Sequence, residues 1–375
     1  MAVNSTVSIV KCDTYDPAVV QSAVRKSVDL LGGIAGFVKP KSRVLVKPNL
    51  LMSKGPESAI TTHPEVVRAV IRLLKEIGCS VIVGDGPSVW GKYIENVEAV
   101  YESTGIGRIC AEEKVQLAKF EKRRWHGKFP MTTVLDEVDC LVSVPKFKTH
   151  DLTLLTGAVK NLFGLVSGTF KTELHKQYYD KEEFSRILVD IYEQARPALT
   201  VVDGILALEG DGPATSGIPR KTGLLVAGRD CVALDSVLAL IMGVEPEDVL
   251  STKEAARRGL GEARREHITV VGERLDAAIG KPFVLPTTSL ATSWKKNLPK
   301  PVVELARRLI RYYPYTVHAN CIKCGACVDA CPKKVISFDK NRRIVFDYKG
   351  CIACFCCQEA CPASGSQLLA GLLKH

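Results

Sequence analysis

Eight of the fourteen cysteines lie near the C-terminal end of the chain in two matching groups. Each group has the spacing Cys-x2-Cys-x2-Cys-x3-Cys-Pro, which is typical of chains that bind two [4Fe–4S] clusters. In that pattern three thiolates of one group wrap around a cluster, and the fourth ligand comes from the other group. The predicted ligands of one cluster, here called the first set, are Cys321, Cys324, Cys327 and Cys361. The predicted ligands of the other cluster, the second set, are Cys331, Cys351, Cys354 and Cys357.

A structural zinc site is the other explanation for closely spaced cysteines. Zinc takes four ligands and prefers two Cys-x2-Cys pairs, whereas here a four-cysteine run occurs twice. The doubled run therefore favours iron–sulfur clusters, and VISFDKNRRIVFDY between the groups predicts the hairpin of a two-cluster ferredoxin domain. Cys356 is off the spacing and is left out of the ligands. Five further cysteines show no ligand spacing and are expected to be buried apolar thiols: Cys12, Cys79, Cys110, Cys140 and Cys231.

Polar residues in the first 290 positions gather where short apolar runs end, at VKPN, GDGPS, VPKFKTH and VVDG. In open α/β sheets, ligands bind beyond the carboxyl ends of the strands. We therefore predict a cleft lined by several lysines without matching carboxylates, which would bind a phosphate or a polycarboxylate. The catalytic candidates are His150, Lys146 and Lys148. The substrate-binding candidates are Lys47, Asn49, His63, Asp85, Lys160, Asn161 and Asp203.

His150 is the first candidate for general acid–base chemistry, because the reference pKa of histidine lies near the operating pH. Burial would also lower the pKa of a lysine and make it a usable proton donor. Plainer explanations stay open. Each lysine taken alone fits a solvated surface charge, His63 fits a helix cap as well as a ligand contact, and Asp85 and Asp203 fit ordinary turn chemistry.

The elements that must position these residues alternate along the chain to about residue 285. Strands are expected at STVSIVKC, RVLVKPN, SVIVGDG, CLVSVP, LTVVDGI, LLVAG and HITVVG. A helix follows the first strand with Asp16 as its N-cap, and THPEVVRAVIRLLKEIG forms another, capped by Thr61 or Thr62. Further helices are expected near residues 183–196, 231–242 and 247–259. Apolar strands separated by helices predict an α/β fold with a mostly parallel sheet covered by helices, plus a C-terminal α+β ferredoxin-like domain.

This pattern divides the chain into an α/β domain at 1–290, a basic linker at 291–315 and a two-cluster ferredoxin domain at 316–375. The linker carries six lysines or arginines against one glutamate, and its VVELARRLIRYY segment is compatible with an amphipathic helix. Such a helix either docks between two domains or lies on a membrane surface. We favour the docked linker.

The segments VKPNL, THPEVV, GDGPS, VPKFKTH, TGAVKNLFGLV and VVDGI with LEGDGP resemble the DUF362 family. This is an uncharacterised group that is often fused to a C-terminal ferredoxin domain. The resemblance covers about residues 5–285 and implies the same two-part organisation here. The nickel-dependent lactate racemase fold is similar by analogy only. Neither resemblance implies a substrate.

Together these features predict an iron–sulfur oxidoreductase. It would exchange electrons with a soluble protein donor or acceptor and pass them to an anionic small molecule or a bound cofactor in the lysine-lined cleft. The alternative is an electron carrier or interaction protein whose α/β domain is a docking scaffold. In a third interpretation the clusters are structural, or one acts as a Lewis acid.

The formal net charge of +10 favours anionic partners. No helix-turn-helix, zinc-finger or RNP pattern occurs, which argues against nucleic acid. No dinucleotide or P-loop fingerprint occurs either, which leaves flavin compatible with the sequence but without a motif. No apolar run is long enough to span a membrane and no signal-peptide pattern opens the chain, so a cytoplasmic location is expected. The sequence does not predict the oligomeric state.

Overall fold

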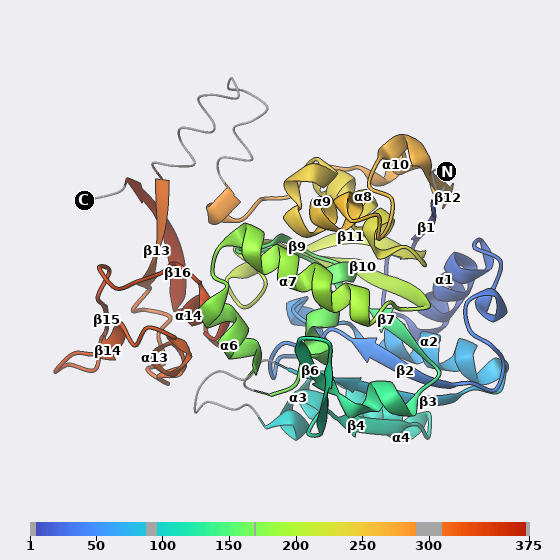
Figure 1. Cartoon of the computed structure of the whole chain (residues 1–375), viewed down its shortest axis with the longest axis horizontal. Coiled ribbons are helices and arrows are strands. Elements are labelled where there is room, and N and C mark those ends of the chain that lie inside the picture. The colour runs from blue at the N-terminus through green and yellow to red at the C-terminus, as the bar shows by residue number, and fades with distance from the viewer. Residues whose placement is uncertain (1–4, 88–95, 169, 290–309, 373–375) are drawn as a thin grey trace.

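The computed structural model describes residues 5–87, 96–168, 170–289 and 310–372 (Figure 1). Its main feature is a ten-stranded sheet, eight strands of which follow the order β12-β1-β11-β10-β7-β2-β3-β4. Within this order β11 pairs antiparallel with β1 and β10, and the other neighbours are parallel. The predicted α/β fold with a mostly parallel sheet is therefore confirmed. The strands are β1 Ser5–Lys11, β2 Arg43–Pro48, β3 Ser80–Asp85, β4 Gln116–Lys119, β7 Cys140–Val144, β10 Leu199–Gly210, β11 Gly217–Gly228 and β12 Ile268–Gly272.

Helices cover both faces of this sheet, because both faces of its strands are apolar. In β2, Leu45 faces one hydrophobic core, while Val44 and Val46 face the other. Helices α1 to α4 pack into the second core, and α5 to α10 contribute to the first (Figure 1). The helices are α1 Pro17–Asp29, α2 Pro64–Glu76, α3 Val97–Ser103, α4 Ile106–Glu112, α5 Ala158–Asn161, α6 Phe170–Gln177, α7 Lys181–Gln194, α8 Cys231–Met242, α9 Leu250–Arg257 and α10 Leu275–Ala278.

The helix starts agree only in part with the sequence predictions. Asp16 caps α1 as predicted, since its carboxylate accepts hydrogen bonds from two backbone N–H groups of the first turn. At α2 the predicted threonine cap is wrong, because His63 is the cap residue and its Nδ1 accepts an N–H bond at 3.2 Å. Thr62 is instead buried, and its hydroxyl donates to the carbonyl of Val144 at 2.6 Å.

Two unpredicted strands shape the region where β7 ends. The chain continues after Pro145 as β8 (Lys146–His150) and turns back as β9 (Leu154–Thr156). Strand β8 pairs parallel with β10 and antiparallel with β9. The expectation that a strand ends at Asp203 is wrong as well, because β10 continues to Gly210 past a register shift. A separate hairpin comprises β5 Arg123–His126 and β6 Phe129–Thr132.

Residues 310–372 form a small module, here called the cysteine module (Figure 1). The hairpin predicted between the cysteine groups is confirmed, and a second strand pair joins the two ends of the module. The elements are β13 Ile310–Thr316, α13 Ala326–Ala330, β14 Ile336–Phe338, β15 Ile344–Phe346, α14 Cys356–Glu359 and β16 Ser366–Leu372.

The predicted linker helix is wrong at residues 310–313, which belong to strand β13. The rest of that prediction, at 291–309, lies outside the described residues, and the domain division stays a prediction. In the part of the chain that the structure describes, no helix is both long and apolar enough to cross a membrane.

Candidate functional site

A cavity of about 50 Å³ lies at the carboxyl ends of the parallel strands β2 and β3. We call it the lysine cavity. Strand β2 supplies Lys47, β3 supplies Asp85, and β8 supplies Lys148 and His150, which the two-residue period of a strand places on one side. Helices α5 and α6 and the segments beside them complete most of the lining with Lys160, Asn161, Phe163, Gly164, Lys171 and His175.

Lys47 is paired with a carboxylate. Its Nζ lies 2.7 Å from Oδ1 of Asp85, and both side chains are buried. Asn161 accepts a further bond from the same ammonium at 3.3 Å. A methyl group on Gly164 would lie 2.2 Å from Oδ1 of Asp85, so only glycine fits beside this pair. The expectation that the lysines lack matching carboxylates is therefore wrong for Lys47, and Asp85 is in an ion pair rather than a simple turn.

Lys148 and Lys160 carry the unmatched positive charge. Among the described residues, neither has a carboxylate oxygen within ion-pair distance. Lys148 donates to the carbonyl of Ile60 at 2.7 Å, and Lys160 lies 5.7 Å from the ring centre of Phe163. Burial and the nearby Lys160 hold the pKa of Lys148 well below its ordinary value, and burial also lowers the pKa of Lys160. These two cations are the groups of the cavity best placed to bind an anion.

His150 lies between the lysines and the cysteine module. Its Nδ1 accepts the N–H of Leu152 at 3.1 Å, so Nε2 carries the hydrogen in the neutral ring. Nε2 lies 3.4 Å from Oε1 of Glu359, without the alignment of a hydrogen bond. Burial, with Lys160 and Lys148 nearby, holds the pKa of His150 well below its ordinary value. A pKa near that of a free histidine is therefore not expected for His150, because burial and the two lysines disfavour its protonated form.

Glu359 is the residue of this cavity that no sequence pattern indicated. It ends α14 of the cysteine module, midway between Cys357 and Cys361, and lines the lysine cavity with 3% of its surface exposed. Burial raises the pKa of Glu359, while Lys160 and Lys148 act against this rise. In Figure 1, α14 is the part of the module that faces α6 and α7. The cysteine module thus supplies one wall of a cavity in the α/β domain.

Helix α6 adds two further residues that were not predicted. Lys171 and His175 are one helical turn apart, and both line the cavity. Lys171 donates to the carbonyl of Gly86, and burial lowers its pKa to about 8. Burial, together with the nearby lysines, lowers the pKa of His175 to about 3. The i, i+4 spacing of a lysine and a histidine in FKTELHKQ was the available signal.

The other predicted site residues, His63, Lys146 and Asp203, form a second group beside the cavity. They do so with Tyr15, which was not predicted, and we call this group the tyrosine cluster. Lys146 lies 2.9 Å from Oδ2 of Asp203 and donates to the hydroxyl of Tyr15 at 2.9 Å. That hydroxyl donates to the other oxygen of Asp203 at 2.8 Å. The ring of His63 stacks on Tyr15 with centres 3.6 Å apart. The polar groups of Tyr15, Lys146 and Asp203 are thus hydrogen-bonded to one another. No residue of the tyrosine cluster is in the lining of the lysine cavity.

The two predicted asparagines both line the lysine cavity. Asn161 is tied down, because its amide nitrogen donates to the hydroxyl of Ser143 at 2.9 Å and its oxygen accepts from Lys47. The side-chain oxygen of Asn49 is buried and accepts no hydrogen bond from the described residues. Asn49 is thus a residue of the cavity lining with an unused acceptor.

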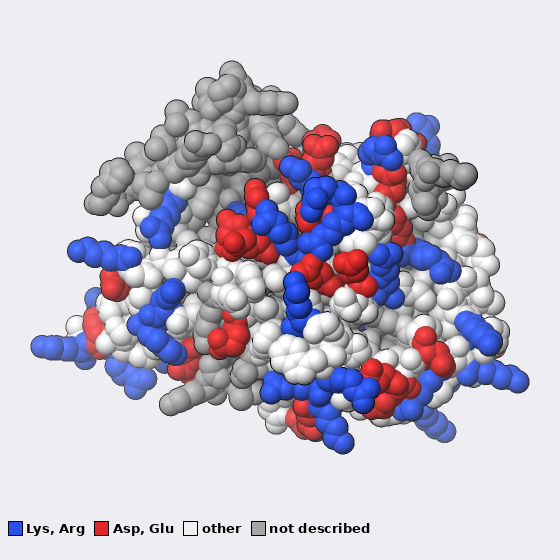
Figure 2. Space-filling model, viewed as in Figure 1, with Lys and Arg blue, Asp and Glu red and all other residues white. Residues whose placement is uncertain are grey.

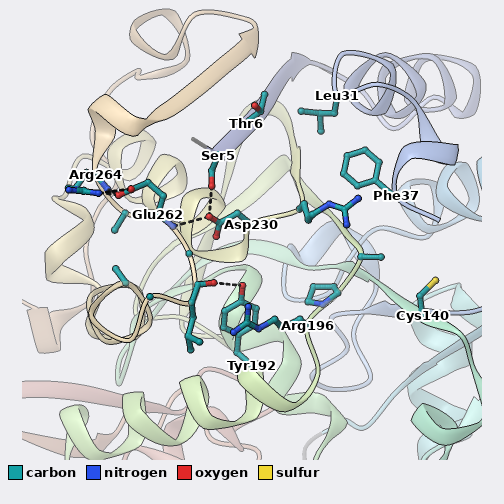
Figure 3. A pocket seen from close by; sticks show the side chains of 18 of the residues that line it. Ser5, Thr6, Leu31, Phe37, Cys140, Tyr192, Arg196, Asp230, Glu262 and Arg264 are labelled. Carbon is teal, nitrogen blue, oxygen red and sulfur yellow. Dashed lines mark hydrogen bonds and ion pairs between the residues drawn. The ribbon is translucent and has the colours of Figure 1, made fainter. Parts of the chain in front are cut away.

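A larger cavity of about 1100 Å³ lies at the other ends of the strands, near the starts of β1, β7 and β10 (Figure 3). Its main acidic groups already have partners. Asp230 accepts from Ser5 and caps α8, and Glu262 pairs with Arg264 at 2.9 Å, as the dashed lines of Figure 3 indicate. None of the predicted site residues lines this cavity. Ligands of such sheets bind beyond the carboxyl ends of the strands, where the lysine cavity lies.

The cysteines surround two further cavities, and the grouping matches the crossed pattern. One cavity is lined by the four cysteines of the first set and the other by the four of the second set. Cys356 lines neither, and packs instead near Ala326 and Ala330. The grouping supports the predicted ligand assignment.

The backbone of the two cysteine loops also fits [4Fe–4S] clusters. Lys323 and Ala353, thirty positions apart, have φ of 58° and 54°, and Gly325 and Phe355 have 83° and 61°. Non-glycine residues in this left-handed region cost of order 1–3 kcal/mol each, so both loops hold the same strained shape. Backbone that alternates in this way forms concave N–H nests, which are found at iron–sulfur sites. The residues present therefore fit [4Fe–4S] clusters.

Comparison with known proteins agrees with this organisation. The profile described as "Domain of unknown function (DUF362)" matches residues 44–239, and the profile "4Fe-4S dicluster domain" matches residues 320–364. The "Thylakoid-associated protein sll1697" of Synechocystis sp. is 32% identical over 268 residues, which cover 70% of this chain and 82% of that protein.

One solved structure, the lactate racemase apoprotein from Thermoanaerobacterium thermosaccharolyticum, is 12% identical with a TM-score of 0.35. The match covers 54% of this chain and about half, 51%, of that one. A likeness at this level says nothing of function. The dicluster match supports an iron–sulfur electron-transfer role for the cysteine module. The chain therefore belongs to the DUF362 family and carries a C-terminal 4Fe-4S dicluster domain.

Proposed function

We propose that this protein is an iron–sulfur oxidoreductase that delivers electrons to a small anionic molecule, or to a bound cofactor, in the lysine cavity. The position of Glu359 carries the proposal. This residue is bracketed by two predicted cluster ligands, Cys357 and Cys361, and its carboxylate lies 3.4 Å from His150. A module for electron transfer and a cavity for an anion therefore share a wall.

Several residues of the cavity have a definite part in this proposal. The [4Fe–4S] clusters, held by the two cysteine sets, supply one-electron transfer when bound. Lys148 and Lys160 bind the anionic group, and the free side-chain oxygen of Asn49 orients the molecule by accepting a hydrogen bond from one of its hydroxyl or N–H groups. The cavity of about 50 Å³ has room for a few waters or a small anionic group, so only part of a larger substrate would enter.

Reduction adds negative charge to the bound anion, and a nearby proton donor offsets it. Lys148 suits this part, because burial brings the pKa of its ammonium down toward values at which it releases a proton. His150 presents the hydrogen on Nε2, so it acts as a hydrogen-bond donor beside Glu359, and the proton comes from Lys148. Lys146, bound to Asp203 and Tyr15, holds β8 beside the cavity.

The test starts with protein purified without oxygen, whose spectrum and mass also show whether a flavin is bound. The protein is reduced with dithionite, freed of excess reductant and mixed with a panel of small carboxylates and phosphate esters. Return of the oxidised spectrum and calorimetric binding are measured for the wild type, Lys148→Met, Lys160→Met and the exposed control Lys253→Met.

At least one compound is expected to bind and to reoxidise the wild type and the control. Both cavity variants should lose binding and reoxidation, while their reduction by dithionite is unchanged. If no compound binds or reoxidises the wild type, or if the cavity variants behave like the control, the proposal is wrong. Loss of partner-protein binding in the cavity variants, with small molecules without effect, would favour the docking scaffold instead.

A further inference from the structure

The two repeats of the cysteine module have matching loops but different surroundings. Cys324 of the first repeat is exposed, whereas Cys354, its counterpart thirty positions later, is 9% exposed. Asp329 is partly exposed, whereas its counterpart Glu359 is buried in the lysine cavity. The four cysteines of the second set are all buried, and none of the first set is. The pseudo-symmetry of the module is therefore broken by burial.

Contacts with the α/β domain account for the buried side. Gln358 donates from its amide to the carbonyl of Asp211 at 2.9 Å, and Thr215 donates to the carbonyl of Cys361 at 2.7 Å. Every residue from 354 to 360 is buried. The second repeat thus faces the lysine cavity, and the loop of the first repeat is left on the outside.

That outer loop combines an exposed cysteine with an exposed apolar side chain. Ile322 has 64% of its surface exposed, and Lys323 and Cys324 beside it are exposed as well. An isolated exposed isoleucine needs no explanation. Here it lies between two predicted ligands of the first set, at the point where that set comes nearest to solvent.

The hairpin of the module brings basic residues to the same loop. The guanidinium of Arg342 lies 5.6 Å from the ring centre of Phe338, and the edge of that ring is 3.6 Å from where a Cβ of Gly325 would be. Lys340 and Arg343, on either side, are exposed. Figure 2 shows lysine and arginine side chains projecting from the side of the molecule where Figure 1 places β14, β15 and α13.

Two acidic residues belong to this neighbourhood, against four basic ones, so its net charge stays positive. Asp339 is turned into the hairpin, where it accepts the backbone N–H bonds of Asn341 and Arg343 at 2.8 and 2.7 Å. Asp329 is partly buried. Four exposed basic side chains remain on what we call the outer-loop surface: Ile322, Lys323, Cys324, Lys340, Arg342 and Arg343.

We propose that the outer-loop surface docks a small acidic redox protein, which is the electron donor of this enzyme. Its acidic groups would meet the basic residues and its apolar centre would meet Ile322, a combination that steers and orients transient partners. The partner is oxidised by one electron, which it loses to the group held by the first set. Electrons thus arrive at the exposed first set and leave on the side of the buried second set. This inference rests on the proposed function for its direction only.

The test uses a plant-type [2Fe–2S] ferredoxin as an acidic probe with the full-length, cluster-loaded protein. One variant, Lys323→Glu/Arg342→Glu, reverses two charges of the outer-loop surface. The matched control, Lys334→Glu/Lys349→Glu, reverses two exposed charges beside the second set in the same module. Calorimetry measures binding of the oxidised probe, and stopped-flow absorbance measures reduction by the reduced probe.

Binding and the second-order rate should each fall at least about tenfold in the outer-loop variant at low salt, and less than about twofold in the control. Added salt should weaken binding of the wild type. An equal or larger loss in the control, no loss in the outer-loop variant, or no binding by the wild type would overturn the proposal. Reduction by dithionite verifies the clusters in every variant. The Lys148→Met protein should still bind the probe. Failure of the docking proposal can therefore be distinguished from failure of the proposed function of the lysine cavity.

Discussion

Asp203 lies 2.9 Å from the ammonium of Lys146, and both side chains are fully buried. A buried ion pair contributes little net stability, but removing one partner leaves a desolvated charge. Asp203 also accepts hydrogen bonds from the hydroxyl of Tyr15 and the backbone N–H of His63. The carboxylate therefore joins three separate segments of the chain.

We expect Asp203→Asn to lower the free energy of unfolding by about 3–5 kcal/mol, because it leaves the ammonium of Lys146 buried without its counter-ion. Denaturant unfolding followed by circular dichroism measures the loss. The control is Glu137→Gln, which breaks the exposed pair with Arg43 at 3.5 Å and should change stability by less than about 1 kcal/mol. Equal effects of the two variants would contradict the buried pairing.

The two cavity lysines Lys47 and Lys148 should differ in what their removal costs. Lys47→Met leaves Asp85 buried without its partner and should lower the free energy of unfolding by about 3–5 kcal/mol. Lys148→Met removes a buried cation that has no carboxylate within ion-pair distance among the described residues, so it should leave stability unchanged or raise it. Thermal unfolding of both variants makes the comparison. A large loss for Lys148→Met would show that its charge is compensated within the fold.

Stability should fall in mild acid, in part through His175. A histidine in the unfolded chain titrates near pH 6.5, whereas the buried His175 has a pKa of about 3. Between these values the unfolded state binds a proton that the folded state does not, so stability decreases as the pH falls. The contribution of this one ring at pH 5.5 is about 1.4 kcal/mol.

The variant His175→Phe keeps an aromatic ring against Phe184, whose centre is 4.5 Å away, and removes the proton uptake. Its loss of stability between pH 7.5 and 5.5 should be smaller than that of the wild type. Unfolding midpoints at both pH values measure this, with the exposed His318→Gln as the control. The same pH response in all three proteins would exclude His175 as a source.

Neighbouring cysteines of the second loop should respond differently to substitution. Cys354→Ser removes a predicted ligand of the second set and should lower the iron content from about eight atoms per chain toward four. Cys356→Ala removes a thiol outside both cysteine cavities and should keep the full content. Iron and sulfide analysis with electron paramagnetic resonance of the reduced protein distinguishes them. Iron loss in the Cys356 variant would place that thiol among the ligands.

Features set by local pattern were predictable from the sequence. The parallel strands follow from apolar residues on both faces, as Val44, Leu45 and Val46 show by alternating between the two cores. The crossed grouping of the cysteines follows from motif spacing. Lys146, Lys148 and His150 were identified by residue type. Their strand β8 was not predicted, because it follows Pro145 directly after β7 and pairs with the short β9 and the distant β10.

What escaped prediction depends on contacts between distant segments. Tyr15 meets Asp203 across 188 positions, and His150 meets Glu359 across the interface with another module. Such contacts arise when preformed elements pack, so no local pattern encodes them. The pKa of His150 escaped for the same reason, since its environment is assembled from three segments that bring Lys148, Lys160 and Glu359 together.

Because Glu359 forms one wall of the lysine cavity, we expect the completion of this cavity to depend on the maturation of the protein. Predicted cluster ligands flank helix α14, with Cys354 before it and Cys361 after it, so we expect metal acquisition to fix the Glu359 carboxylate beside His150. A newly made chain without iron is expected to have an unfinished cavity with excess positive charge. We therefore expect the lysine cavity to be complete only in chains that have acquired their metal centres.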